Sequence, residues 1–221
     1  MYEICLDSFT NRKFPKDCVF VTFGLYSDIG FELDAAHKFG CEVYTHDPSA
    51  IAAQYIEYIK DKQLDHNKFH YEKIGLWGRD GLLEFGSVKP NSNNPAWDKQ
   101  IRMGMIRPTE QKKKVTNEMI TQSKFVLPVQ RLETIMQKRG IDHINVLKID
   151  AEGAEWSFFE DWFINHPLTR IPCDILILEF HYFESSMDSR YGGSKVIHDI
   201  IQRLHQYGFE TYMIDSYRMI S

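Results

Sequence analysis

Three acidic residues follow a short apolar run in the second half of the chain. The run covers 144–149, and Asp150, Glu152 and Glu155 fall within the next six residues. An apolar run of this length that ends in a polar turn is typical of a buried parallel strand, so we expect Asp150 at the carboxyl end of a strand. Open α/β sheets bind their ligands at that edge. Alternatively, the three acids favour the N-terminus of the next helix, where the helix dipole stabilises negative charge.

A histidine follows another apolar stretch, the most apolar of the chain. This stretch covers 173–181 and is predicted to be a central strand that ends at His181. An imidazole at that position can remove a hydroxyl proton near neutral pH, while Asp150 and Glu152 orient the reactants. A hydrogen-bonded structural histidine is an equally good interpretation. Asp150, Glu152 and His181 are also types of side chain that a divalent cation accepts. Their spacing does not require a metal, so no metal ligands are assigned.

The elements that must position these residues alternate between strands and helices. This pattern predicts a Rossmann-like α/β fold of three layers (αβα), with a mostly parallel sheet, in a single domain over 1–221. Strands are expected at 18–23, 41–46, 68–74, 144–149, 173–181 and 209–214, and helices at 31–39, 51–59, 129–139, 154–163 and 195–207. The alternation stops between about 81 and 126, apart from a possible edge strand at 82–85. We interpret this region as an insertion or lid over the ligand edge, with a disordered surface loop as the alternative.

Composition excludes several classes of protein. A net charge of −5 and a pI near 6.0 argue against a general nucleic-acid binder, and the lysine run at 112–114 is expected in a solvated loop. No apolar stretch approaches the length of a membrane span, and the first residues do not form a signal peptide. The compartment therefore stays open between the cytoplasm and a fragment of a secretory-pathway protein.

The four cysteines are not arranged as a metal site. None is in a C-x-x-C pair, so a structural zinc site is not expected. Cys18 and Cys41 each precede a predicted parallel strand, and the two could form a disulfide if those strands are neighbours. The alternative is that all four cysteines are reduced thiols.

The turn after the first strand has features of a nucleoside site. Gly24 lets the backbone approach a ligand, but the G-x-G-x-x-G pattern that binds a pyrophosphate is missing. An uncharged or zwitterionic nucleoside fits better, with Asp28 accepting from an ammonium group or, alternatively, capping the next helix. Asp47 ends the second strand and can bind the ribose hydroxyls, or can simply form the turn before a proline. Gly75 and Leu76, after the third strand, would lie beside the base.

Together these residues resemble the FkbM-type, S-adenosylmethionine-dependent methyltransferases. The segment LKIDAEGAE at 147–155 matches that family's K-I-D-x-E-G-x-E signature. The segments FGLYSDIGFE at 23–32, GCEVYTHDPS at 40–49 and LEFH at 178–181 are closest to a eukaryotic methyltransferase-like branch of the family. The resemblance extends from about 18 to 214.

This resemblance implies a class I methyltransferase fold, in which one strand of the sheet is antiparallel and would require chain beyond Ser221. It implies S-adenosyl-L-methionine as cofactor. The residues implied around its methionine part are Gly24, Tyr26, Ser27 and Asp28, and those on the ribose and adenine are Asp47, Gly75 and Leu76. The candidate catalytic residues remain Asp150, Glu152 and His181, chosen from their positions at the strand ends. In the family's usual first turn, D-x-G-A-N-x-G, an acid stands where this chain has Thr22 or Gly24.

Three functions follow from these observations. The first is an S-adenosylmethionine-dependent methyltransferase that methylates an oxygen atom of a small-molecule or glycan acceptor. The second is a catalytically degenerate binding domain on the same fold, which the departure in the first turn supports. The third, a nucleotide-dependent oxidoreductase, is disfavoured by the missing G-x-G-x-x-G.

Overall fold

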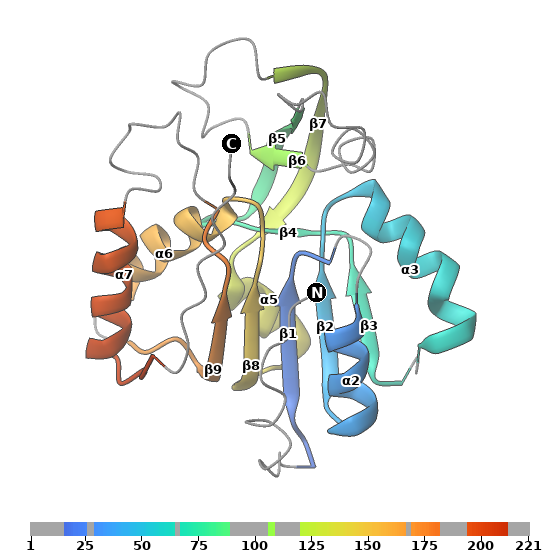
Figure 1. The fold of residues 1–221 in the computed structure, drawn as a ribbon, viewed down its shortest axis with the longest axis horizontal. Helices are drawn as coiled ribbons and strands as arrows, with labels where there is room; N and C mark the ends of the chain where they lie inside the picture. Colours follow the sequence, from blue (N-terminus) through green and yellow to red (C-terminus); the bar gives the residue numbers. More distant parts are fainter. Residues whose placement is uncertain are drawn as a thin grey trace.

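A computed structural model of the chain describes residues 16–25, 29–64, 67–88, 106–108, 120–166, 169–181 and 194–211. Its main sheet has five strands, all parallel, in the order β3-β2-β1-β8-β9 (Figure 1). The strands are β1 (Val19–Phe23), β2 (Glu42–His46), β3 (Phe69–Glu72), β8 (Ile144–Ile149) and β9 (Cys173–Leu178). The predicted parallel α/β sheet is thereby confirmed.

Helices cover both faces of this sheet and make the fold three-layered. They are α2 (Gly30–Lys38), α3 (Ala50–Gln63), α5 (Leu132–Arg139), α6 (Ala154–Asn165) and α7 (Ser194–Gln206). Apolar side chains of α2 and α3 pack with Phe20 and Val43 on one face. Those of α5, α6 and α7 pack with Val21 and Phe23 on the other. Because both faces are buried, strand β1 is apolar along nearly its whole length rather than alternating.

The region predicted as an insertion contains most of a second sheet. Strands β4 (Gly75–Leu76), β5 (Gly81–Val88), β6 (Ile106–Pro108) and β7 (Ile120–Gln130) form it in the order β4-β7-β5-β6 (Figure 1). A strand is present at 82–85, as expected, but β5 is not an edge strand along its whole length, because it also pairs with β6 from Phe85 onward. The helix predicted from 129 begins only at Leu132, because Val129 still pairs with Gly75 and Gly81 in the sheet. The lysine run at 112–114 lies outside the described residues.

Strand β9 also differs from its prediction. Within the described residues it lies at the edge of the main sheet rather than at the centre. Its side chains are apolar because helices cover both faces: Ile175 and Ile177 pack on the α2 side, and Leu176 and Leu178 on the α6 side. Of the strand predicted at 209–214, residues 209–211 are not in a strand, and the remainder lies outside the described part.

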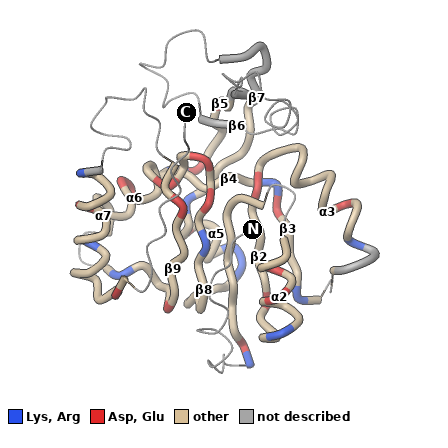
Figure 2. Tube along the Cα trace, viewed as in Figure 1, with Lys and Arg blue, Asp and Glu red and all other residues tan. Residues whose placement is uncertain are grey.

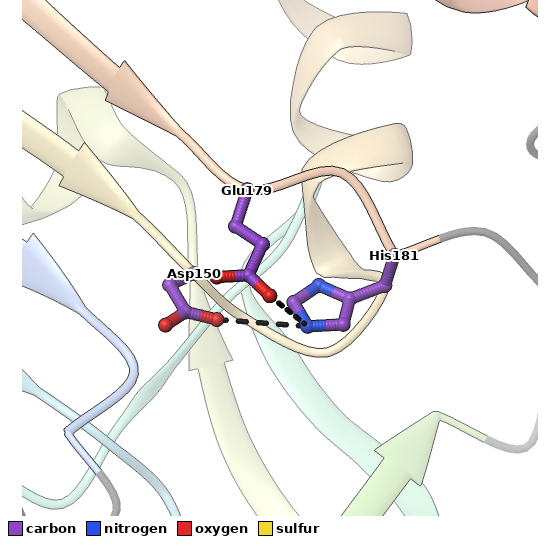
Figure 3. A group of neighbouring side chains, drawn as sticks. All are labelled: Asp150, Glu179 and His181. Atoms are coloured by element: carbon purple, nitrogen blue, oxygen red, sulfur yellow. Dashed lines mark ion pairs between the residues drawn. The ribbon is translucent and has the colours of Figure 1, made fainter. Parts of the chain in front are cut away.

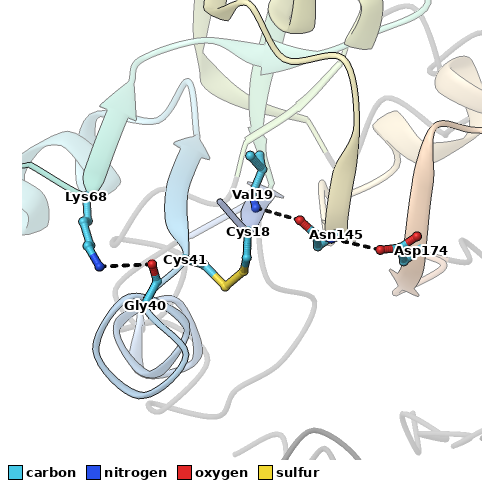
Figure 4. Close-up of a disulfide and its surroundings, with 7 residues drawn as sticks. All are labelled: Cys18, Val19, Gly40, Cys41, Lys68, Asn145 and Asp174. Carbon is cyan, nitrogen blue, oxygen red and sulfur yellow. Dashed lines mark hydrogen bonds between the residues drawn. A yellow bond between two sulfur atoms is a disulfide. The ribbon is translucent and has the colours of Figure 1, made fainter. Parts of the chain in front are cut away.

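The amino ends of β1 and β2 are joined covalently. Cys18 and Cys41 form a disulfide (Figure 4), which the sequence allowed if these strands were neighbours. Cys173 is free and buried at the start of β9. Among the described residues, no helix combines the length and apolar character needed to cross a membrane.

Candidate functional site: a carboxylate–histidine cluster at the carboxyl edge

The carboxyl ends of β8 and β9 bring four ionisable side chains together. His181 Nε2 lies 3.6 Å from Asp150 Oδ1, 3.6 Å from Glu179 Oε1 and 3.7 Å from Glu152 Oε1. Figure 3 shows Asp150, Glu179 and His181 pointing toward one another, and Figure 2 shows acidic residues along the turns that follow the two strands. We call Asp150, Glu152, Glu179 and His181 the carboxylate–histidine cluster. It unites the three predicted catalytic residues and adds Glu179, which had no predicted role in catalysis.

Backbone pairing fixes the two turns that carry the cluster. The amide of Glu179 donates to Ile149 O at 2.9 Å, so the parallel pairing of β8 and β9 continues to the residue before the turn. After β8 the chain reverses through Glu152 and Gly153, which have φ values of 51° and 103°. A positive φ is uncommon for a residue other than glycine, and such conformations concentrate at functional sites.

A buried glutamate holds the histidine from behind. Glu155, in the first turn of α6, is 0% exposed. Its Oε1 accepts the backbone amide of His181 at 2.7 Å and lies 3.0 Å from His181 Nδ1, while its Oε2 accepts the amide of Gly153 at 3.0 Å. Because an ionised carboxylate only accepts hydrogen bonds, Nδ1 carries the proton and Nε2 faces the cluster. The bond to Gly153, the N-cap of α6, is the helix-start role that the sequence suggested for these acids, and the contacts to His181 reach beyond the helix.

The cluster is electrostatically coupled. Burial disfavours the charged form of His181 and is the strongest single influence on its pKa. The hydrogen bond to Glu155 and the charges of Glu155, Glu152 and Asp150 act in the opposite direction, and together they raise the pKa of His181 to about 9. Burial, reinforced by the charge of Glu179, raises the pKa of Asp150 to about 6, although His181 and Lys148 act in the opposite direction. The site therefore concentrates negative charge around a single imidazole.

The glycine turn after β1 lies directly against this cluster. The amide of Asp150 donates to Phe23 O at 3.0 Å. Gly24 has a φ of 86°, and a Cβ at this position would lie 1.6 Å from Asp150 O. Only glycine allows this approach, so the turn predicted to hold a cofactor and the acidic turn after β8 form one continuous edge.

Asp47 stabilises the same turn from the end of β2. Its Oδ2 accepts the amide of Leu25 at 2.9 Å, and its Oδ1 accepts the amide of Ser49 at 2.8 Å. The turn-forming role considered from the sequence is thus present.

The other residues predicted on the cofactor side are placed as follows. Gly75 and Leu76 are buried in β4, and a Cβ on Gly75 would lie 3.2 Å from Pro48 Cγ, next to Asp47. Tyr26, Ser27 and Asp28 lie outside the described residues.

A carboxylate that the sequence did not suggest lies beneath the first turn. Glu32, in the first turn of α2, is 0% exposed, and its Oε1 accepts from Thr22 Oγ1 and from Lys148 Nζ, each at 3.2 Å. Among the described residues, its Oε2 has no hydrogen-bond partner. Thr22 is one of the two positions, with Gly24, where the resembled family pattern has an acid, and α2 brings a carboxylate to that threonine. The sequence carried one signal that Glu32 is buried: it stands three positions before Ala35, which places the two on the same buried face of the helix.

Comparison with known proteins agrees with this architecture. The family described as Methyltransferase FkbM domain matches residues 29–211. The human protein named probable methyltransferase-like protein 24 is 25% identical over 227 aligned positions, which cover 100% of this chain and 49% of that protein. The chain thus spans about half the length of this curated relative. No solved structure matches the chain.

Proposed function

Because the chain belongs to the FkbM methyltransferase family, we propose that it transfers a methyl group from S-adenosyl-L-methionine to an oxygen atom of a small-molecule or glycan acceptor. One observation carries the proposal: the glycine turn after β1 and the carboxylate–histidine cluster adjoin at one edge of the sheet, where Asp150 donates to Phe23 O. Open α/β sheets bind their ligands at this edge.

The proposed cofactor site follows the carboxyl ends of β1, β2 and β3. Asp47, at the end of β2, accepts hydrogen bonds from the ribose hydroxyls. Gly75 and Leu76 lie against the adenine, and the residues around the methionine part are Gly24, Tyr26, Ser27 and Asp28. The buried carboxylate of Glu32, 3.2 Å from Thr22 Oγ1, supports the turn from below.

The acceptor would lie over the ends of β1 and β8. S-Adenosylmethionine supplies an activated methyl group, and the protein must hold the acceptor oxygen in line with it. Asp150 and Glu152 orient the acceptor hydroxyl, and the neutral form of His181 accepts its proton at Nε2 while Glu155 holds Nδ1. Because the pKa of His181 is raised to about 9, this neutral form, and with it the rate of methyl transfer, should increase as the pH rises toward 9. The new bond joins the acceptor oxygen to the methyl carbon, and the sulfonium leaves as a thioether.

Titration calorimetry with S-adenosylhomocysteine tests the cofactor assignment, with NAD as the control ligand. We expect the first to bind and the second not to bind. In Asp47→Asn, which keeps the shape of the side chain, we expect at least about a tenfold weaker affinity, because a charged acceptor is worth more than a neutral one. Asp142→Asn, at an exposed position, should bind like the unchanged protein. Equal affinities for the two variants would refute the ribose assignment.

The second candidate is a catalytically degenerate binding domain. It is favoured by the first turn, where Thr22 or Gly24 stands in place of the acid of the family's usual pattern. Turnover separates it from the first proposal: binding of S-adenosylhomocysteine without methyl transfer from labelled cofactor to any of a panel of hydroxylated acceptors would favour this candidate.

A further inference from the structure

We propose that Asp150, Glu179 and His181 form a binding site for one divalent transition-metal ion. One ligand atom from each residue can be chosen so that all three lie within 4.8 Å of one another. They come from two adjacent parallel strands whose pairing continues to Glu179, so their separation is set by the main sheet (Figure 3).

The distances fit ligands of a shared ion better than a direct ion pair. His181 Nε2 is 3.6 Å from both Asp150 Oδ1 and Glu179 Oε1. A charge-assisted N–H···O bond is about 2.7–2.9 Å long, so neither contact is a good hydrogen bond. Two ligands at about 2.0–2.2 Å from one metal are separated by roughly 3.0–3.5 Å, depending on the geometry. The two contacts of His181 Nε2 are close to that spacing, and the three ligand atoms, which lie within 4.8 Å of one another, would have to move closer together around an ion.

The orientation of the imidazole is also that of a metal ligand. A ligating histidine almost always donates its other ring N–H to a carboxylate or carbonyl group, which fixes the tautomer and the ring direction. Here Nδ1 lies 3.0 Å from the fully buried Glu155, and Trp156 Nε1 donates to His181 O at 3.1 Å. Both contacts hold the residue from outside the cluster and leave Nε2 toward Asp150 and Glu179.

The donor set indicates the class of ion. One imidazole nitrogen and two carboxylate oxygens suit Mn²⁺, Fe²⁺ or Zn²⁺, whereas Mg²⁺ favours oxygen donors and retained waters. Glu152 Oε1 lies 3.7 Å from Nε2, beside this donor set. If the proposed methyl transfer is correct, the ion would bind the acceptor oxygen. A His181 that ligates the ion cannot accept the hydroxyl proton, which would then pass to Glu152 of the same cluster.

Binding of Mn²⁺ to the chelator-treated full chain tests the site without requiring catalysis. The fall in the electron paramagnetic resonance signal of free Mn²⁺ reports the bound fraction, and we expect one ion per chain. Asp150→Asn, Glu179→Gln and His181→Gln should each weaken binding at least about tenfold. Glu160→Gln, an equal change of charge at an exposed position of α6, should leave binding unchanged.

Two results would overturn the proposal: no binding of Mn²⁺ or Zn²⁺ by the unchanged chain, or equal binding by the three cluster variants and Glu160→Gln. Thermal melts establish that each variant is folded, and Glu179 is the safest site because its side chain is 41% exposed. Titration with S-adenosylhomocysteine in the presence of chelator is a separate measurement. Binding of S-adenosylhomocysteine without binding of a metal ion would refute only this inference. Binding of a metal ion without binding of S-adenosylhomocysteine would refute only the proposed cofactor.

Discussion

The two edges of the main sheet are built in opposite ways. At the amino edge, polar groups meet at hydrogen-bonding distance (Figure 4): Asn145 accepts the amide of Val19 at 2.9 Å and donates to Asp174 at 2.9 Å. The disulfide between Cys18 and Cys41 closes the same edge between β1 and β2. These contacts pair opposite or complementary groups, and each one favours the folded state.

At the carboxyl edge, like charges are instead held close together. Asp150, Glu152 and Glu179 surround His181 at 3.6–3.7 Å, and Gly24 adopts a backbone conformation that other residues rarely allow. The protonated His181 offsets part of this repulsion, but three carboxylates share one positive charge and Asp150 keeps a raised pKa of about 6. The difference indicates that the amino edge stabilises the fold and that the carboxyl edge is organised for binding.

The largest expected effect is at the turn that connects the cofactor side to the cluster. Gly24→Ala should lower the free energy of unfolding by about 4 kcal/mol or more, because its Cβ would collide with Asp150 O in a left-handed conformation. The control is Gly140→Ala: Gly140 has a φ of 65° but no neighbour within 4 Å of a Cβ, so only about 1–2 kcal/mol should be lost. Urea denaturation measures both, and equal losses would show that the close approach to Asp150 is unimportant.

The disulfide should give the next largest effect, and it should be confined to stability. It joins residues 23 positions apart, and closure of a loop of this size is worth roughly 3 kcal/mol. We expect the double variant Cys18→Ala/Cys41→Ala to lose about that much free energy of unfolding while its affinity for S-adenosylhomocysteine stays unchanged. A parallel loss of affinity in the folded variant would remove the distinction between the two edges.

Acid should weaken the fold through His46, which ends β2 beneath Gly24. Burial lowers the pKa of His46 to about 4, with the ring 1% exposed. Since an unfolded histidine has a pKa near 6.5, the unfolded state binds more protons between these values, and stability falls as the pH decreases through this window. The expected loss between pH 7 and pH 5 is about 2 kcal/mol.

The variant His46→Gln isolates this contribution from that of other groups. Its free energy of unfolding should depend less steeply on pH between 7 and 5 than that of the unchanged protein. His37→Gln, at an exposed position of α2, should keep the original slope. An unchanged slope in His46→Gln would show that His46 does not resist protonation.

The smallest effects should differ in sign between the two edges. Glu179→Gln removes one of the charges around Asp150 and should leave the free energy of unfolding unchanged or raise it by about 0.5 kcal/mol, because a half-exposed charge contributes little. Asn145→Ala, at the amino edge, removes two hydrogen bonds and should lower it by about 1–2 kcal/mol. If Glu179→Gln lowered the free energy of unfolding as Asn145→Ala does, the repulsion inferred between the carboxylates at the carboxyl edge would be contradicted.

Much of the fold could be predicted because its signals are local. Strand β8 and the acids after it, the glycine after β1 and the helices on either side all follow from runs and periods of a few residues. The second sheet could not be predicted, because β5 and β7 pair across a long segment without a strong period. The sequence predicted strand β9 at the centre of the sheet, whereas it lies at the edge of the described sheet. An apolar run does not distinguish a central strand from an edge strand whose two faces are both covered by helices.

By itself, the sequence determined which residues stand at the ends of the strands: Asp150 after β8, Asp47 after β2 and Gly24 after β1. Only the tertiary structure decided which partners they meet. Glu155 reaches His181 across 26 positions, and Lys148 reaches Glu32 across 116. Periodicity fixes the face and the end of an element, whereas contacts between distant side chains depend on the order of the strands, which no local pattern contains.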